Sequence, residues 1–191
     1  MEKMKVRELV TPIKEFSRIS SEATFMDAIE ALEKADQEFK MGKAPERILL
    51  VYDATGRIVG KLSPIDVVQG LEPNYMNIEN VRSGPYHRLS QASVELMKSQ
   101  VRLWHNPLGE LCKKAYSIKI RDFIKMPTPD QMVKADDKMD EALHLFVVAR
   151  HGSLFVQEGK EIVGLLRFSD VYKKIKEEIR ACPLPDEIQQ A

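Results

Sequence analysis

One pattern of residues occurs twice in this chain. The stretch 58–67 reads Ile-Val-Gly-Lys-Leu-Ser-Pro-Ile-Asp-Val, and the stretch 162–171 reads Ile-Val-Gly-Leu-Leu-Arg-Phe-Ser-Asp-Val. Each copy is typical of an apolar strand that contains a glycine and leads into a helix with an aspartate in its first turn. Two upstream stretches also correspond, 25–32 with 139–146 and 7–10 with 121–124. A duplication of this length predicts two equivalent units, a pseudo-twofold axis between them and paired clefts where they meet.

The composition argues against several classes of protein. The chain has 191 residues, with 29 Lys plus Arg and 29 Asp plus Glu, so its formal net charge is zero. A neutral chain lacks the overall positive charge that attracts nucleic acid or an anionic membrane, although a local patch is compatible with it. No run is long and apolar enough to cross a bilayer, and the first seven residues do not resemble a signal peptide. We therefore expect no membrane association.

The two cysteines, Cys112 and Cys182, fit no metal-ligand spacing. We expect reduced thiols in a cytoplasmic protein, with a single disulfide as the alternative. The four histidines are scattered and lie near no Cys or carboxylate constellation, so we expect no metal site.

The first repeat predicts a strand, a helix, a hairpin and a second helix. A short strand or extended entry is expected over Val6–Thr11, and Thr24 is expected to cap a helix that buries Phe25, Ala28, Ile29 and Leu32 and stops at Gly42. Residues 48–52 and 58–62 form the hairpin strands around an Asp-Ala-Thr-Gly turn. The next helix has Ser63 as its N-cap, Pro64 at its first position and Asp66 in its first turn.

The second repeat predicts the same order. Val133 opens it, and Asp136 or Asp137 is expected to cap a helix with Met139, Ala142, Leu143 and Phe146 on its buried face. A hairpin over 154–166 and an amphipathic helix that starts near Asp170 and ends before Pro183 follow. The first repeat has about ten more residues between its helix and its hairpin, and these predict a helix longer by two to three turns.

We divide the chain accordingly into repeat 1 (1–71), an insertion (72–118), repeat 2 (119–182) and a C-terminal tail (183–191). The insertion has no counterpart in the repeat. Its apolar spacing and the Asn106-Pro107 helix start predict a helical segment that packs on the pair or takes part in self-association.

The tandem order, with Gly-x-x-Ser-x-x-Asp closing the first hairpin and a related sequence closing the second, resembles the cystathionine-β-synthase (CBS) domain pair, or Bateman module. This resemblance implies an α/β (α+β) fold of two β-α-β-β-α repeats packed with pseudo-twofold symmetry, plus the helical insertion. It also implies a regulatory protein, not an enzyme, that forms a homodimer and acts on an effector protein not identified by the sequence.

The resemblance further implies an adenosine-containing ligand in the cleft between the repeats: AMP, ADP, ATP or S-adenosylmethionine. In the family the motif aspartate binds the ribose hydroxyls, which assigns that role to Asp66 and Asp170. A carboxylate accepts hydrogen bonds only, which suits two neighbouring hydroxyl donors. Ser63 is expected near the ribose and phosphate. The other expected ligand contacts are Thr11, Ile48, His151 and Arg167.

Arg167 departs from the family pattern because the first repeat has Ser63 at the same place. The arginine either removes a polar contact or brings a guanidinium near a phosphate; a surface ion pair is the purely structural alternative. Likewise, Ser63 and Asp66 have the spacing of a capping box, which requires no ligand.

The motifs of common catalytic sites are missing from the sequence, and the basic residues of the insertion form no single stripe, so nucleic-acid binding is not favoured. Two hypotheses remain. One is a ligand-sensing module, and the other is a dimeric protein-interaction scaffold with empty clefts.

Overall fold

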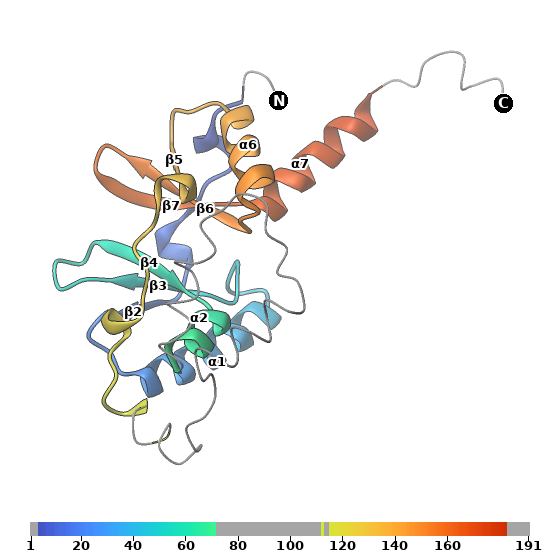
Figure 1. Ribbon diagram of the computed structural model, residues 1–191. Helices are drawn as coiled ribbons and strands as arrows, with labels where there is room; N and C mark the ends of the chain where they lie inside the picture. Colours follow the sequence, from blue (N-terminus) through green and yellow to red (C-terminus); the bar gives the residue numbers. More distant parts are fainter. Residues whose placement is uncertain (1–3, 72–111, 113–114, 183–191) are drawn as a thin grey trace, which may run out of the picture. The chain divides into compact units, whose positions relative to one another are not determined.

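The computed structural model describes residues 4–71, 112 and 115–182, and Figure 1 shows the elements they form. The first repeat consists of β2 (Arg18–Ser20), α1 (Phe25–Lys40), β3 (Leu49–Tyr52), β4 (Ile58–Leu62) and α2 (Pro64–Leu71). The second consists of β5 (Met132–Lys134), α6 (Met139–Ala149), β6 (Ser153–Glu158), β7 (Glu161–Arg167) and α7 (Phe168–Ala181). The predicted fold class is confirmed, because both repeats have the order β-α-β-β-α.

Nearly all of the predicted insertion 72–118, and the tail 183–191, lie outside the described residues. Among the described residues no helix is both long and apolar enough to span a bilayer. Cys112 and Cys182 are free and exposed.

The first repeat folds as a three-stranded sheet with strand order β2-β3-β4. β2 and β3 are parallel, joined by the crossover helix α1, and β3 and β4 form the antiparallel hairpin. Phe25, Ala28 and Leu32 of α1 pack against one face of this sheet in a cluster with Leu49, Val51, Leu62 and Val67. The predicted helix face is therefore correct at these positions, whereas Ile29 is 40% exposed.

The second repeat forms a four-stranded sheet with strand order β1-β7-β6-β5. Its extra edge strand is β1 (Thr11–Pro12), from the start of the chain, which lies antiparallel to β7 with Thr11 opposite Leu165. α6 and α7 pack on one face of the sheet, and the cluster there includes Met139, Ala142, Phe146, Leu154, Val156, Leu166 and Val171.

The segment that precedes each repeat in sequence belongs to the compact unit of the other repeat, and we call these two segments exchanged. One unit contains residues 4–15 and 127–182, and the other contains 16–71, 112 and 115–126. Residues 4–15 thus pack with the repeat that follows much later in the chain. The predicted extended entry over Val6–Thr11 is replaced by a 3-10 turn at Val6–Glu8 followed by β1. The repeat-based boundaries follow chain order, whereas the compact units do not.

Equivalent hydrogen bonds and buried side chains attach each exchanged segment to its unit. The amide of Val6 donates to the carbonyl of Asp137 at 3.0 Å, and the amide of Ile120 donates to the carbonyl of Ala23 at 3.0 Å. Val6 and Ile120 have no exposed surface. Apolar burial and buried backbone hydrogen bonds therefore hold both segments.

Matching ion pairs lie beside these contacts. Asp136 accepts from Arg7 Nη2 at 2.7 Å and from Lys5 Nζ at 3.1 Å. Glu22 accepts from Arg121 Nη1 at 2.7 Å and from Lys119 Nζ at 2.8 Å. Hydrogen bonds from these cations lower the pKa of both carboxyls. All six side chains are exposed, so the ion pairs add little stability compared with the buried contacts.

The ten additional residues of the first repeat are shared between helix and loop. α1 has 16 residues and α6 has 11, while the loops that follow them span 41–48 and 150–152. α1 is therefore longer by about 1.4 turns at 3.6 residues per turn, not by the two to three turns expected. Gly42, with φ +70°, ends α1 as predicted.

The helix starts agree with the prediction at Thr24 and differ from it at α6. The amide of Asp27 donates to Thr24 Oγ1 at 3.2 Å, and the amide of Thr24 donates back to Asp27 Oδ2 at 2.7 Å, as in a capping box. At α6 the N-cap is Lys138, with no side-chain hydrogen bond. Asp137 instead accepts from the amide of Lys134 at 2.7 Å, so it serves the strand end and not the helix.

We predict that Gly164→Ala destabilises the protein by about 1–3 kcal/mol, because a Cβ at this position would lie 2.3 Å from the Thr11 carbonyl oxygen and would push β1 away from β7. Gly60→Ala should cost less, since its Cβ would lie 3.0 Å from the Lys125 carbonyl oxygen. Gly152→Ala is the control, with no atom within 4 Å of the added Cβ. Urea unfolding measures the three values, and equal losses for Gly164 and Gly152 would contradict the close approach.

Candidate functional site

The first glycine-to-aspartate motif, Gly60–Asp66, spans the end of β4 and the start of α2. The Ser63 hydroxyl donates to Asp66 Oδ2 at 2.5 Å, and the Ser63 amide donates to the same oxygen at 2.7 Å. The hydrogen bond from the Ser63 amide to the Asp66 carboxylate is one half of a capping box. The hydroxyl, however, donates to the carboxylate, which fixes Asp66 in the first helical turn. Both hydrogen bonds end on Oδ2 of Asp66.

The second motif, Gly164–Asp170, is held differently. Arg167 is the N-cap residue of α7, with no hydrogen bond from its side chain to the helix backbone. Its Nε donates to Asp170 Oδ2 at 2.7 Å and its Nη2 donates to Asp170 Oδ1 at 2.8 Å. The side chains are only 19% and 28% exposed. The ion-pair alternative for Arg167 is therefore present, but as a half-buried bidentate pair and not on the open surface.

The exchanged N-terminal segment brings a third predicted residue to the second motif. Thr11 is buried and lies opposite Leu165, two residues before Arg167 on β7. Because directly opposed residues of an antiparallel pair point to the same face, Thr11, Leu165 and Arg167 share one face of the sheet. Thr11 thus lies in the unit of the second motif, although it precedes the first repeat in sequence.

His151 lies in the same unit, two residues before Ser153, which is opposite Arg167 in the β6–β7 pair. Its Nε2 lies 3.1 Å from Asp130 Oδ2. Hydrogen bonds from the side chains of Thr128 and then His151 lower the pKa of Asp130. His151 is therefore oriented by a carboxylate at the strand edge.

The seven predicted ligand residues thus fall into two sets. The second-repeat unit contains Thr11, His151, Arg167 and Asp170, and the first-repeat unit contains Ile48, Ser63 and Asp66. Ile48 is half-buried immediately before β3. No contact in the structure tests their binding of a ligand, so the assignment stays a prediction.

Lys61 is a charged residue of the first motif that the sequence reasoning missed. It lies opposite Leu50 within the β3–β4 pair. Burial lowers the pKa of its ammonium, and the carboxylates of Glu46 and Asp66 partly oppose that effect. The repeat contains the signal that could have identified it, since Lys61 corresponds to the apolar Leu165. The two motifs therefore differ in charge within the strand, at Lys61 and Leu165, as well as at Ser63 and Arg167.

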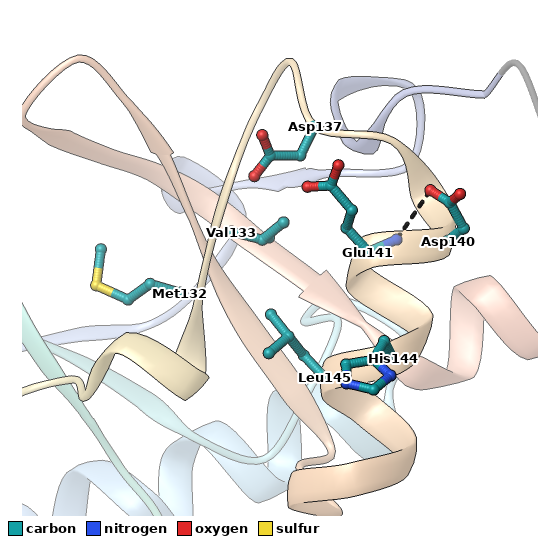
Figure 2. A pocket seen from close by; sticks show the side chains of 7 residues that line it. All are labelled: Met132, Val133, Asp137, Asp140, Glu141, His144 and Leu145. Atoms are coloured by element: carbon teal, nitrogen blue, oxygen red, sulfur yellow. Dashed lines mark hydrogen bonds between the residues drawn. The ribbon is translucent and has the colours of Figure 1, made fainter.

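A pocket of about 520 Å³ lies elsewhere in the second-repeat unit, between α6 and β5. Figure 2 shows the side chains that line it. Asp137 and Glu141 lie over its upper part, and Leu145 and His144 lie at its lower part. Asp140 Oδ1 accepts from the Glu141 amide at 2.9 Å. None of the predicted ligand residues lines this pocket. Its carboxylates would repel a phosphate, so we place the candidate site at the motifs.

Within residues 4–71, 112 and 115–182, no group of three His, Cys, Asp or Glu side chains could hold a metal ion.

Comparison with known proteins agrees with this arrangement. Residues 120–177 match the family model of the CBS domain. A search of curated protein sequences finds no match. The resemblance inferred from the repeat is confirmed by the family match and by similar solved structures.

Three of those structures show the range of similarity. A CBS domain-containing protein of unknown function from Kribbella flavida has 20% identity and a TM-score of 0.52, over 91% of this chain and 98% of that one. CBSX2, solved in complex with AMP, has 17% identity and a TM-score of 0.54, over 91% and 96%. The CBS domain of a bacterial CNNM/CorC family Mg²⁺ transporter, solved with ATP, has 16% identity and a TM-score of 0.57, over 92% and 89%. At these identities the similarity shows the fold.

We predict that Asp130 titrates below its ordinary pKa of 3.8, because Thr128 and His151 stabilise its ionised form. A lowered pKa in the folded state means that this stabilisation is present above pH 3.8 and is lost as the pH falls through the lower folded value. NMR titration of the carboxyl should show its pKa rising in Thr128→Ala and rising less in His151→Ala. An Asp130 pKa that stays the same in both variants would contradict the contacts described.

Proposed function

We propose that this chain, which matches the CBS domain model over its second repeat and has the fold of CBS-domain proteins throughout the described residues, is a regulatory module that binds an adenosine-containing ligand at its glycine-to-aspartate motifs. CBS-domain proteins are typically regulatory and not catalytic. AMP and ATP are bound by two structures that share this fold. They make adenine nucleotides the first ligands to test, with S-adenosylmethionine beside them.

The observation that carries the proposal is the placement of the two aspartates. Each carboxylate lies in the first turn of a helix, directly after a strand, and is held there by the residue three positions earlier. Fixing the carboxylate before the ligand arrives lowers the entropy cost of binding. The helix start beside it also supplies backbone N–H groups that can receive a phosphate. This arrangement suits a ribose and a phosphate on one ligand.

A ligand that binds only the folded chain must raise its stability. We predict that at least one of AMP, ADP, ATP and S-adenosylmethionine raises the melting temperature by about 5 °C or more at a hundredfold excess over its Kd. Asp66→Ala or Asp170→Ala should remove the shift for the motif concerned. Guanosine monophosphate serves as the matched control ligand. If none of the four ligands moves the transition, the sensing function is wrong.

The dimeric scaffold is a second candidate, and a surface feature favours it. Five apolar side chains of α6 and α7 are exposed by 40–69%: Val147, Val148, Phe168, Tyr172 and Ile179. The rings of Phe168 and Tyr172 stack with centroids 6.3 Å apart. Exposed apolar groups on adjacent helices are suited to contact between protein surfaces. We infer a homodimer through these helices, in a cytoplasmic protein, with the effector protein still to be identified.

We predict that light scattering gives twice the 21.8 kDa chain mass, and that Tyr172→Glu shifts the protein to the monomer by placing a charge in an apolar contact. Met126→Glu is the control, because Met126 is also exposed but lies outside α6 and α7. A monomeric wild type would exclude this interface.

A further inference from the structure

Each compact unit has a docking site for a short segment with the same kind of sequence. Residues 4–10 read Met-Lys-Val-Arg-Glu-Leu-Val, and residues 118–124 read Ile-Lys-Ile-Arg-Asp-Phe-Ile. We call residues 4–15 the N-terminal segment and residues 115–126 the internal segment. Both have the same order of apolar, basic and acidic side chains, so the two docking sites recognise one type of segment.

The two segments dock through corresponding backbone hydrogen bonds. Besides the bond from Val6, two bonds of 3.0 Å attach the N-terminal segment: Met139 N–H to the Met4 carbonyl, and Arg7 N–H to the Ala135 carbonyl. Besides the bond from Ile120, two bonds of 2.9 Å attach the internal segment: Phe25 N–H to the Ile118 carbonyl, and Arg121 N–H to the Ser21 carbonyl. A segment from a second copy of the chain would form the same contacts, because the docking site recognises the segment alone.

The hinges that follow the two segments differ. The N-terminal segment ends in the 3-10 turn Ile13–Glu15, none of whose residues is buried. The corresponding residues after the internal segment, 127–129, read Pro-Thr-Pro, and each proline fixes its φ angle. The Thr128 amide also donates to Gln131 Oε1 at 3.1 Å. The hinge of the N-terminal segment can therefore change direction at a lower cost than the hinge of the internal segment.

The docking site of the N-terminal segment lies close to the helices of the proposed homodimer. The Met4 carbonyl accepts from Met139, the first residue of α6. The exposed Val147 and Val148 lie near the other end of α6, which has 11 residues and is about 16 Å long. The N-terminal segment spans up to about 40 Å when extended. It is therefore long enough to reach the docking site of a second copy across this interface.

We propose that the two copies of the homodimer swap their N-terminal segments, so that residues 4–15 of each copy dock on the second-repeat unit of the other. This inference rests on the homodimer under Proposed function and names a second contact within it. The contacts of the segment are the same with and without the swap, so the hinge and the interface decide between the two arrangements. The helix contacts bring the docking sites together and raise the effective concentration of the second copy's segment.

The bridge between Lys5 and Lys138 supplies a test of the swap. These residues are directly opposed and antiparallel, with the hydrogen bonds of Val6 and Met139 on either side of them. They form a non-hydrogen-bonded pair, whose Cα atoms are about 4.5 Å apart, and this spacing suits a disulfide. Both lysines are exposed, so Lys5→Cys/Lys138→Cys should fold.

Thr24 and Lys119 form the corresponding bridge of the internal segment, so Thr24→Cys/Lys119→Cys is the matched control. Both double variants also have Cys112→Ser and Cys182→Ser, because these two thiols are free and exposed. Each protein is refolded from urea, oxidised with glutathione disulfide and run on a denaturing gel without reductant. Circular dichroism establishes that each variant is folded.

We expect Lys5→Cys/Lys138→Cys to give a covalent dimer, because the disulfide joins two chains. Thr24→Cys/Lys119→Cys should form its disulfide within one chain and stay at the monomer position. The covalent dimer fraction should differ between them about tenfold or more, since two prolines restrict the hinge of the internal segment.

The wild-type chain gives a second measurement without any substitution, because positions 5 and 138 are both lysines. Unlabelled and heavy-isotope-labelled chains are unfolded, mixed, refolded together and treated with an amine-reactive crosslinker. The swap predicts linked peptides of Lys5 and Lys138 in which one partner is labelled and the other is not. Segments that stay with their own chain give linked peptides of a single label.

Each contrary result has a definite meaning. Disulfides and crosslinks formed only within single chains would show that the swap is wrong, while light scattering at twice the chain mass would show that the homodimer stands without it. A monomeric wild type would exclude both. Covalent dimers to the same extent from both cysteine pairs would contradict the role of the hinge. A folded Lys5→Cys/Lys138→Cys variant that forms no disulfide would contradict the docking contacts themselves.

Discussion

The second-repeat unit depends on the close approach of β1 to β7. Thr11 and Pro12 run directly over Gly164, and the space left by the missing side chain is occupied by the Thr11 carbonyl. This contact completes the sheet with a segment from the other end of the chain, and it places Thr11 on the same face as Arg167. Gly164, which opens the second motif, is therefore required for this packing. Gly60 has the same role beside Lys125 in the first-repeat unit.

Much of this fold can be predicted from the repeat, because strand and helix periods are local properties of the sequence. The exchange of the preceding segments cannot. Residues 7–10 and 121–124 are alike, and their acidic partners Glu22 and Asp136 are alike as well. Because the two segments are alike, the sequence offered only chain order as a guide to their partners. Chain order groups residues 7–10 with the first repeat, whereas the compact units group them with the second. Similarly, the number of additional residues in the first repeat, about ten, does not show how many of them lengthen the helix and how many lengthen the loop.

Contacts within the candidate site could be predicted where the spacing of two residues along the chain decides whether their side chains can meet. A hydroxyl and a carboxylate three residues apart at a helix start can meet, and Ser63 and Asp66 do so. The bidentate ion pair between Arg167 and Asp170 depends on the rotamers of both side chains, which the sequence does not give. From the sequence, an ion pair was one of three alternatives for Arg167. Lys61 was missed because a strand with mostly apolar residues reads as uniformly apolar. The lowered pKa of its ammonium comes from burial, which is a property of the tertiary structure.

The exchange of segments also has a kinetic consequence during synthesis. Residues 4–15 are synthesised before the first repeat, whereas the strand with which they pair, β7, belongs to the second repeat and is synthesised after the whole of the first. Contacts between distant parts of a chain form slowly, because a long loop must close before they bring any stability. The first-repeat unit becomes complete once residue 126 has emerged, while the N-terminal segment still lacks its partner. Val6, which the folded protein buries completely, therefore cannot reach its buried position until the second repeat has been translated.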